Sequence, residues 1–204
     1  SDVVLMTAHA GDETGTTIHI KGGKIVSNDA SQLRNGTQIT VSDLFYNTPA
    51  RLKYLSSLAT ELSHVSDIVN RLALSHSDVA FVLKNNGKTL LKTAGNGNQK
   101  QTFSAIYGVK AAAKMTSFNA KDLDFEVDGM VSYPELTRSN RNGISLLING
   151  RYIRNFKLTK AVLNGYGSKL MVGRFPYAVI NIRLDPLLCD VNVHPTKQEV
   201  RISK

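Results

Sequence analysis

The 204-residue sequence contains a single cysteine, Cys189, which rules out an internal disulfide framework and a thiolate metal cluster. We expect Cys189 to be a small buried apolar residue. No apolar run approaches the roughly 18 residues that a membrane span needs, and the first residues lack the basic-then-apolar pattern of a signal peptide. These absences favour a cytoplasmic protein without a membrane partner.

Acidic residues are absent between Leu136 and Leu184, a stretch that contains nine basic residues. They are Arg138, Arg141, Arg151, Arg154, Lys157, Lys160, Lys169, Arg174 and Arg183. The rest of the chain has basic and acidic residues in equal number, so the formal net charge of +9 lies in this stretch. Such a field attracts polyanions through counterion release. Nucleic acid is the first candidate; an anionic membrane surface, an acidic protein and a plain solvated surface are the alternatives.

The chain begins without an initiator methionine, inside an apolar run at residues 3–6 that predicts a buried strand. We therefore expect a piece of a longer protein. The Gly22-Gly23 pair is a hairpin signal between two predicted strands. The strands predicted after the first one are residues 16–21, 24–27 and 38–44.

From Leu52 to Leu72, apolar residues recur every three or four positions, which is typical of a helical face. Thr48 is predicted to cap this helix with its hydroxyl, and Pro49 suits the first helical position, where no amide donor is required. We expect the helix in two pieces, with Thr60 as the second cap.

The second half of the sequence mixes hairpins and helices, which favours an α+β fold. Asn-Gly steps at residues 86–87 and 149–150 predict turns. The nearly all-apolar run at residues 144–148 predicts a strand inside a sheet. The other predicted strands are residues 80–84, 88–93, 121–131 and 178–184, and the predicted helices are residues 101–108 and 156–163.

Three segments resemble motifs of the MutL family. Residues 36–51 read GTQITVSDLFYNTPAR, similar to the motif that closes the family's ATPase domain. Residues 147–155 read LINGRYIRN and resemble a strand and turn of its second domain. Residues 190–201 read DVNVHPTKQEVR and resemble its lysine-bearing loop. The segments have the family's order and spacing, so the chain is identified as a fragment of a MutL-type DNA mismatch repair protein.

The resemblance implies the ATP-binding fold shared by gyrase, Hsp90-type chaperones, histidine kinases and MutL. Residues 1–55 would supply the last strands of that ATPase domain. Residues 56–204 would form a transducer-like α/β sandwich, similar to the second domain of gyrase, with a basic DNA-facing surface. The family's main nucleotide-binding motifs lie upstream of residue 1, and no replacement for them is present. ATP and Mg²⁺ are therefore expected in the full-length protein, with neither bound to this fragment, which should be inactive alone.

Two residues are expected to contribute to the nucleotide site. The resemblance implies that Lys197 reaches the γ-phosphate across the domain boundary, and a compact ammonium suits a phosphate on which charge accumulates. Lys197 is therefore the predicted catalytic residue. Thr37 matches a threonine that helps hold the adenine end, although a structural role remains open. No partner cluster stands near His194 in sequence, so we interpret it as structural and predict no metal site.

Arg151 matches a family position implicated in DNA contact. The further predicted nucleic-acid-binding residues, chosen on charge and neighbourhood, are Arg154, Lys157, Lys160 and Arg174. Tyr152 and Tyr177 have rings that could stack on bases, but core packing is the favoured interpretation. Nothing resembles a helix designed to read base edges, so we expect phosphate contacts with little sequence preference.

The mechanism that these features suggest is an ATP-gated clamp. Two protomers of the full-length protein would close on nucleotide binding, hold DNA, and relay a signal from a mismatch-recognition protein to downstream repair factors. The alternatives are a stand-alone basic module that binds RNA or ribosomes and the transducer of a type II topoisomerase. An independent enzyme is least favoured, because no nucleophile-base pair or carboxylate dyad is visible.

Overall fold

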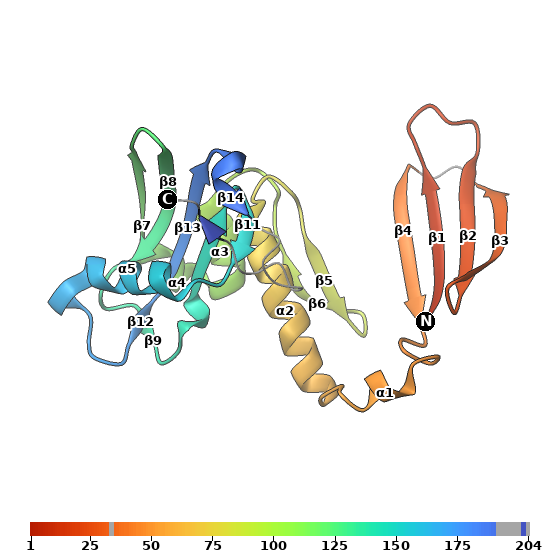
Figure 1. Cartoon of the computed structure of the whole chain (residues 1–204), viewed down its shortest axis with the longest axis horizontal. Coiled ribbons are helices and arrows are strands. Elements are labelled where there is room, and N and C mark those ends of the chain that lie inside the picture. Colours follow the sequence, from red (N-terminus) through yellow and green to blue (C-terminus); the bar gives the residue numbers. More distant parts are fainter. Residues whose placement is uncertain (33–34, 191–200, 203–204) are drawn as a thin grey trace. The chain divides into compact units, whose positions relative to one another are not determined.

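The computed structural model describes residues 1–32, 35–190 and 201–202 and divides into two compact units (Figure 1). The first unit is Ser1–Glu61 and the second is Leu62–Lys204. The division between them falls inside helix α2 (Leu58–Ser75). The assignment of residues 1–55 and 56–204 to two functional domains stays a prediction.

The first unit contains a four-stranded antiparallel sheet, drawn in red to orange in Figure 1. Its order is β3-β2-β1-β4, with β1 at Asp2–Ala8, β2 at Gly15–Lys21, β3 at Lys24–Ser31 and β4 at Gly36–Ser42. The hairpin between β2 and β3 turns at Gly22 and Gly23, whose φ angles of 59° and 86° favour glycine. The four strands predicted from the sequence are confirmed, but residues 3–6 of β1, predicted to be buried, are only half-buried.

The helical segment that follows is in two pieces, as predicted, but both predicted caps are wrong. Pro49 opens the short helix α1 (Pro49–Leu52), while the Thr48 hydroxyl makes no capping hydrogen bond. Thr60 lies inside α2 and is not its cap. Ser57 takes that role, because its hydroxyl accepts a hydrogen bond from the Thr60 amide at 3.3 Å.

A five-stranded sheet forms the centre of the second unit, in the order β11-β10-β13-β8-β7. The strands are β7 (Met115–Lys121), β8 (Phe125–Ser132), β10 (Ile144–Ile148), β11 (Arg151–Ile153) and β13 (Ala178–Leu184). β10 and β13 are parallel, and the other neighbours are antiparallel. The predicted strand at residues 121–131 is wrong in its start, because a turn at residues 122–124 separates β7 from β8.

Both faces of this sheet are covered by helices, which explains why every residue of β10 is buried. On one face, Leu146 and Ile148 pack with Leu158 and Val162 of α5 (Phe156–Tyr166). On the other face, Leu147 belongs to a cluster that includes Leu74 of α2, Phe103 of α3 (Gln99–Tyr107) and Ala112 of α4 (Val109–Ala113). The alternation of side chains along β10 thus serves two cores, and the α+β prediction is confirmed.

Shorter elements complete the second unit. Asn86 and Gly87 turn the predicted hairpin of β5 (Val82–Asn85) and β6 (Lys88–Lys92). The remaining pairs are β9 (Thr137–Arg138) with β12 (Phe175–Pro176) and β14 (Cys189–Asp190) with β15 (Arg201–Ile202). The 3₁₀ turns are η1 (Arg141–Gly143), η2 (Gly167–Lys169) and η3 (Pro186–Leu188).

Tyr166 connects the end of α5 to the sheet through its hydroxyl, and removing this hydroxyl should change the pH dependence of the protein's stability. Its hydroxyl donates a hydrogen bond to the Ser132 carbonyl at 2.6 Å, and burial raises its pKa above the ordinary 10.0. The protonated Tyr166 hydroxyl therefore stabilises the folded state below about pH 10, and this contribution to the free energy of unfolding is lost as the pH rises through the folded-state pKa. Tyr166→Phe should cost about 1 kcal/mol at neutral pH and flatten the alkaline loss. Urea unfolding from pH 7 to 11 measures both effects, and an unchanged alkaline limb in the variant would contradict this assignment.

Candidate nucleic-acid interface

Four of the predicted nucleic-acid residues lie on β11, on α5 or in the link between them, and form what we call the cationic segment. Arg151 begins β11, at the edge of the sheet, and Arg154 follows that strand. Lys157 and Lys160 are three residues apart on α5, which puts them on one helix face. All four side chains are exposed, and within the described residues none forms an ion pair. Their charge is therefore available to an anion from solution.

Two other cations of the acid-free stretch already have partners within the fold. Arg174 donates from Nε to the Thr137 hydroxyl at 3.0 Å and from Nη2 to the Thr137 carbonyl at 3.1 Å, next to the β9–β12 pair. Arg183 forms ion pairs with Glu126 at 3.3 Å and Asp128 at 2.9 Å on neighbouring β8. Because these two carboxylates offset its charge, the positive electrostatic field at Arg183 is weaker than the sequence suggests. A nucleic-acid contact by Arg174 stays a prediction.

Arg138 and Arg141 belong to the acid-free stretch but were not among the predicted nucleic-acid-binding residues, and both lie over aromatic rings. The guanidinium carbon of Arg138 is 5.5 Å from the ring centroid of Tyr177. That of Arg141 is 5.3 Å from the centroid of Phe156 and 5.5 Å from that of Phe175. All three distances are typical of cation–π contacts, which hold a guanidinium in place without neutralising its charge.

A hollow of about 370 Å³, which we call the arginine–phenylalanine pocket, opens beside the cationic segment. Its walls come from α2, η1, β10, β11 and the start of α5. They are formed by Arg71, Arg141, Asn142, Ile144, Leu146, Tyr152, Ile153, Arg154, Asn155, Phe156 and Thr159. The pocket thus combines exposed arginines with an aromatic ring and amide side chains, a composition suited to a nucleotide.

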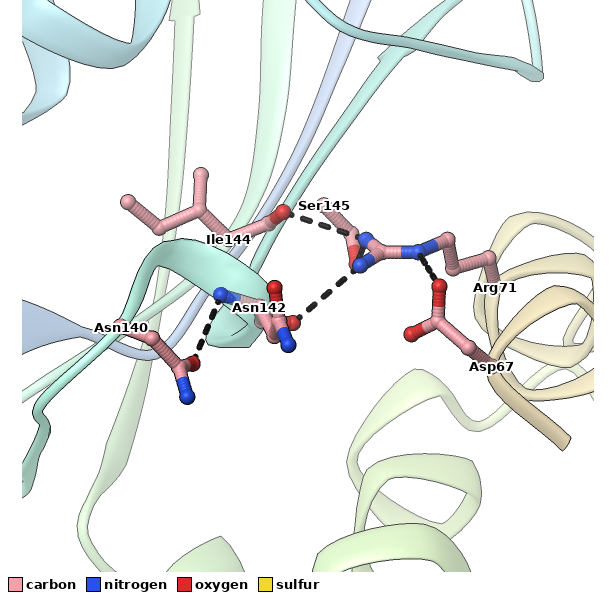
Figure 2. A network of polar contacts seen from close by, with 6 residues as sticks. All are labelled: Asp67, Arg71, Asn140, Asn142, Ile144 and Ser145. Atoms are coloured by element: carbon pink, nitrogen blue, oxygen red, sulfur yellow. Dashed lines mark hydrogen bonds and ion pairs between the residues drawn. The ribbon is translucent and has the colours of Figure 1, made fainter. Parts of the chain in front are cut away.

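Arg71 belongs to the wall of this pocket, and Figure 2 shows the polar contacts of its guanidinium. Its guanidinium is almost fully buried and bonds to Asp67 at 2.8 Å, the Ile144 carbonyl at 3.2 Å, the Ser145 hydroxyl at 3.2 Å and the Asn142 carbonyl at 3.4 Å. The Tyr152 ring lies 4.3 Å from its guanidinium carbon. Arg71 therefore joins α2 to η1, β10 and β11.

A second, more polar hollow of about 590 Å³ shares Asn142 and Arg154 with the first. It is lined by Ser63, His64, Ser66, Asp67, Asn70, Ile106, Tyr107, Arg138, Asn142 and Arg154. Burial raises the pKa of Tyr107, whose ring packs against Tyr177 at 4.9 Å between centroids.

Tyr152 and Tyr177 pack against the core cluster, so the core interpretation of both rings is confirmed.

Thr37 lies in the first unit, on edge strand β4. Its hydroxyl is 2.9 Å from that of Thr7 on β1, and both residues line a depression of about 390 Å³. Such a site has polar groups for a ligand, but the adenine contact of Thr37 stays a prediction.

Lys197 and His194 lie outside the described residues. Within residues 1–32, 35–190 and 201–202, no group of three or more His, Cys, Asp and Glu side chains could hold a metal ion. In the same ranges, no helix has the length and apolar character needed to cross a membrane.

Comparison with known proteins places these features in a family. Residues 103–204 match the model of the family described as DNA mismatch repair protein, C-terminal domain. The chain is 64% identical over 204 residues to the DNA mismatch repair protein MutL of Ligilactobacillus salivarius and 58% identical over the same length to that of Lactococcus lactis subsp. cremoris. Each match covers 100% of this chain and 31% of the relative, so the chain spans under a third of the length of these proteins.

Solved structures show the same fold. The Aquifex aeolicus MutL ATPase domain complexed with ADP is 25% identical, with a TM-score of 0.72 over 91% of this chain and 68% of that one. The gyrase B-subunit of Myxococcus xanthus, at 13% identity, has a TM-score of 0.54 over 98% of this chain and 61% of that one. The predicted α+β fold of the gyrase and MutL type is confirmed. With the family match over residues 103–204, these similarities show that the chain belongs to the MutL family of DNA mismatch repair proteins.

Proposed function

We propose that the chain comprises the end of the ATPase domain and the DNA-facing second domain of a MutL-type protein that acts as an ATP-gated clamp. The observation that carries the proposal is the cationic segment, whose exposed arginines and lysines have no carboxylate partner within the described residues. Phosphate contacts of this kind bind DNA with little sequence preference. In this proposal, Arg151, Arg154, Lys157 and Lys160 hold the DNA backbone.

ATP and Mg²⁺ would act in the full-length protein, as the ADP complex of the Aquifex aeolicus MutL ATPase domain suggests. Among the described residues, the Thr37 hydroxyl is the candidate contact to ATP. We expect most ATP and Mg²⁺ ligands to come from parts of the full-length protein outside this chain, so the chain alone should not hydrolyse ATP. The Lys197 ammonium would contact the γ-phosphate. Because this contact forms only while the γ-phosphate is present, it would distinguish the two nucleotide states.

The full-length protein would work in the cytoplasm as an ATP-bound homodimer. Its partners would be DNA, a mismatch-recognition protein and downstream repair factors. The family match argues against the alternative predicted from the sequence, a stand-alone RNA- or ribosome-binding module, although RNA phosphates could bind the same cationic segment. ATP-dependent closure on DNA by the full-length protein would favour the clamp, whereas nucleotide-independent binding restricted to RNA would favour the module.

Reversing the charge of Arg151 should remove a phosphate contact. In Arg151→Glu, we expect the slope of log affinity against log salt for duplex DNA to flatten by about one unit, because one fewer counterion is released. Fluorescence anisotropy between about 50 and 200 mM salt measures the slope. Lys88→Glu, an equal charge change at the exposed start of β6, is the matched control and should preserve it. An unchanged slope in Arg151→Glu, or an equal change in both variants, would contradict the contact.

A further inference from the structure

Phe156 is an exposed aromatic residue in a strongly basic setting. It is the first residue of α5, and 66% of it is exposed to solvent. The arginine–phenylalanine pocket places Arg141, Arg154, Asn142 and Asn155 around it. An apolar protein partner would have to bury these two arginines, whereas a nucleotide offers a flat base for the ring and a phosphate for the guanidinium groups.

The Arg141 side of this pocket is held in place before any ligand binds. The Arg141 guanidinium lies against both Phe156 and Phe175. The turn that carries Arg141 is fixed at Asn142, whose amide donates to the Asn140 side chain at 3.1 Å and whose carbonyl accepts from Arg71 at 3.4 Å (Figure 2). A preorganised pocket of this kind orders few side chains on binding, which favours affinity.

We propose that Phe156 is a stacking platform for an unpaired base of a single-stranded nucleic acid, with Arg141 and Arg154 binding the adjoining phosphates. This inference rests on the proposed DNA binding and deepens it. In a closed duplex the faces of the bases are covered by their stacked neighbours, so the pocket can take a base only from a single strand or an opened site. The Asn142 side-chain amide lines the same pocket and offers hydrogen bonds to the base edge. The Asn155 side chain caps α5, because its Oδ1 accepts from the Leu158 amide at 3.0 Å, so only its Nδ2 group is left to donate to a base.

The test compares two probes of equal charge, an oligothymidylate of about 16 nucleotides and an abasic oligomer of the same length. Phe156→Ala should weaken oligothymidylate binding by about 5- to 100-fold, because one stacked base is lost, and leave abasic binding unchanged. Phe156→Trp should retain the affinity for oligothymidylate. Leu123→Ala, a matched control at a fully exposed apolar residue in the β7–β8 turn, should change neither affinity. Circular dichroism checks that each variant is folded.

Equal losses on both probes, or no loss on either, would overturn the stacking role while leaving phosphate binding intact. Equal sensitivity of polyglutamate binding to Phe156→Ala would assign the ring to an acidic protein instead and overturn the inference. If the unaltered chain binds neither oligomer nor duplex, both the inference and the proposed DNA binding fail.

Discussion

ATP turnover by the full-length protein should fall by about 100-fold when Lys197 is replaced by alanine, because a cation beside the transferred phosphate stabilises the charge of the transition state. The lysine ammonium is a compact point charge, which suits a single terminal phosphate. We expect the loss mainly in kcat, since the interaction strengthens as charge develops during transfer. Steady-state phosphate release at saturating ATP measures it.

The matched control is Lys88→Ala, which removes an exposed lysine of the β5–β6 hairpin and should leave turnover unchanged. Lys197→Arg keeps the charge but presents a planar guanidinium, so we expect only partial recovery. Turnover in Lys197→Ala equal to that of the unaltered protein would remove Lys197 from the mechanism. A fall in Lys88→Ala as well would indicate a general effect of surface charge.

The sheets and turns could be predicted from the sequence because their signals are local. The Asn149-Gly150 pair predicts the turn from β10 to β11, and Asn149 has a φ of 49°, which asparagine tolerates better than most residues. Strand β7 was harder, since its exposed residues at the sheet edge leave Phe118 as one of few apolar markers. The apolar residues of β7 are Met115, Phe118 and Ala120, and this spacing does not follow the strict alternation that marks a half-buried strand.

Helix caps depend on the path of the preceding chain, which composition alone does not determine. The Thr48 hydroxyl had the right chemistry, but its backbone angles are φ −138° and ψ 65°, and no capping bond forms. At α2 the Ser57 hydroxyl reaches the Thr60 amide, so the helix begins before the predicted cap. Both predictions recognised a helix start and erred in the residue that satisfies its first amides.

The charged surface shows a comparable limit. The sequence counts Arg183 with the other cations, but strand pairing places it opposite Glu126 of β8, from outside the acid-free stretch. The arginine–phenylalanine pocket likewise needs Arg71, whose partners in η1 and β10 lie 71 to 74 residues away in sequence. No local sequence pattern predicts these contacts between residues that are far apart in sequence. Sequence therefore located the cationic segment, while folding decided which cations remain unpaired.

Replacing Arg71 by methionine should destabilise the second unit by about 3 kcal/mol. Methionine can fill much of the space, but the Ile144 carbonyl and the Ser145 hydroxyl lose a donor in a buried environment. The ion pair itself contributes less, because the Asp67 side chain is 42% exposed and its charge is screened by water. Urea unfolding measures the change, with hydrogen exchange assigning it to the second unit.

The matched control is Asp67→Asn, which removes the charge but keeps an acceptor for Arg71 Nε and should cost well under 1 kcal/mol. Arg71→Lys keeps a cation, but the lysine ammonium cannot reach the acceptors of both η1 and β10. Its loss of stability should therefore lie between those of Arg71→Met and Asp67→Asn. Because Tyr152 lies against Arg71 and directly follows Arg151, loosening this anchor should also weaken DNA binding. A methionine variant as stable as the unaltered chain would mean that water replaces the guanidinium, and that Arg71 does not hold the pocket.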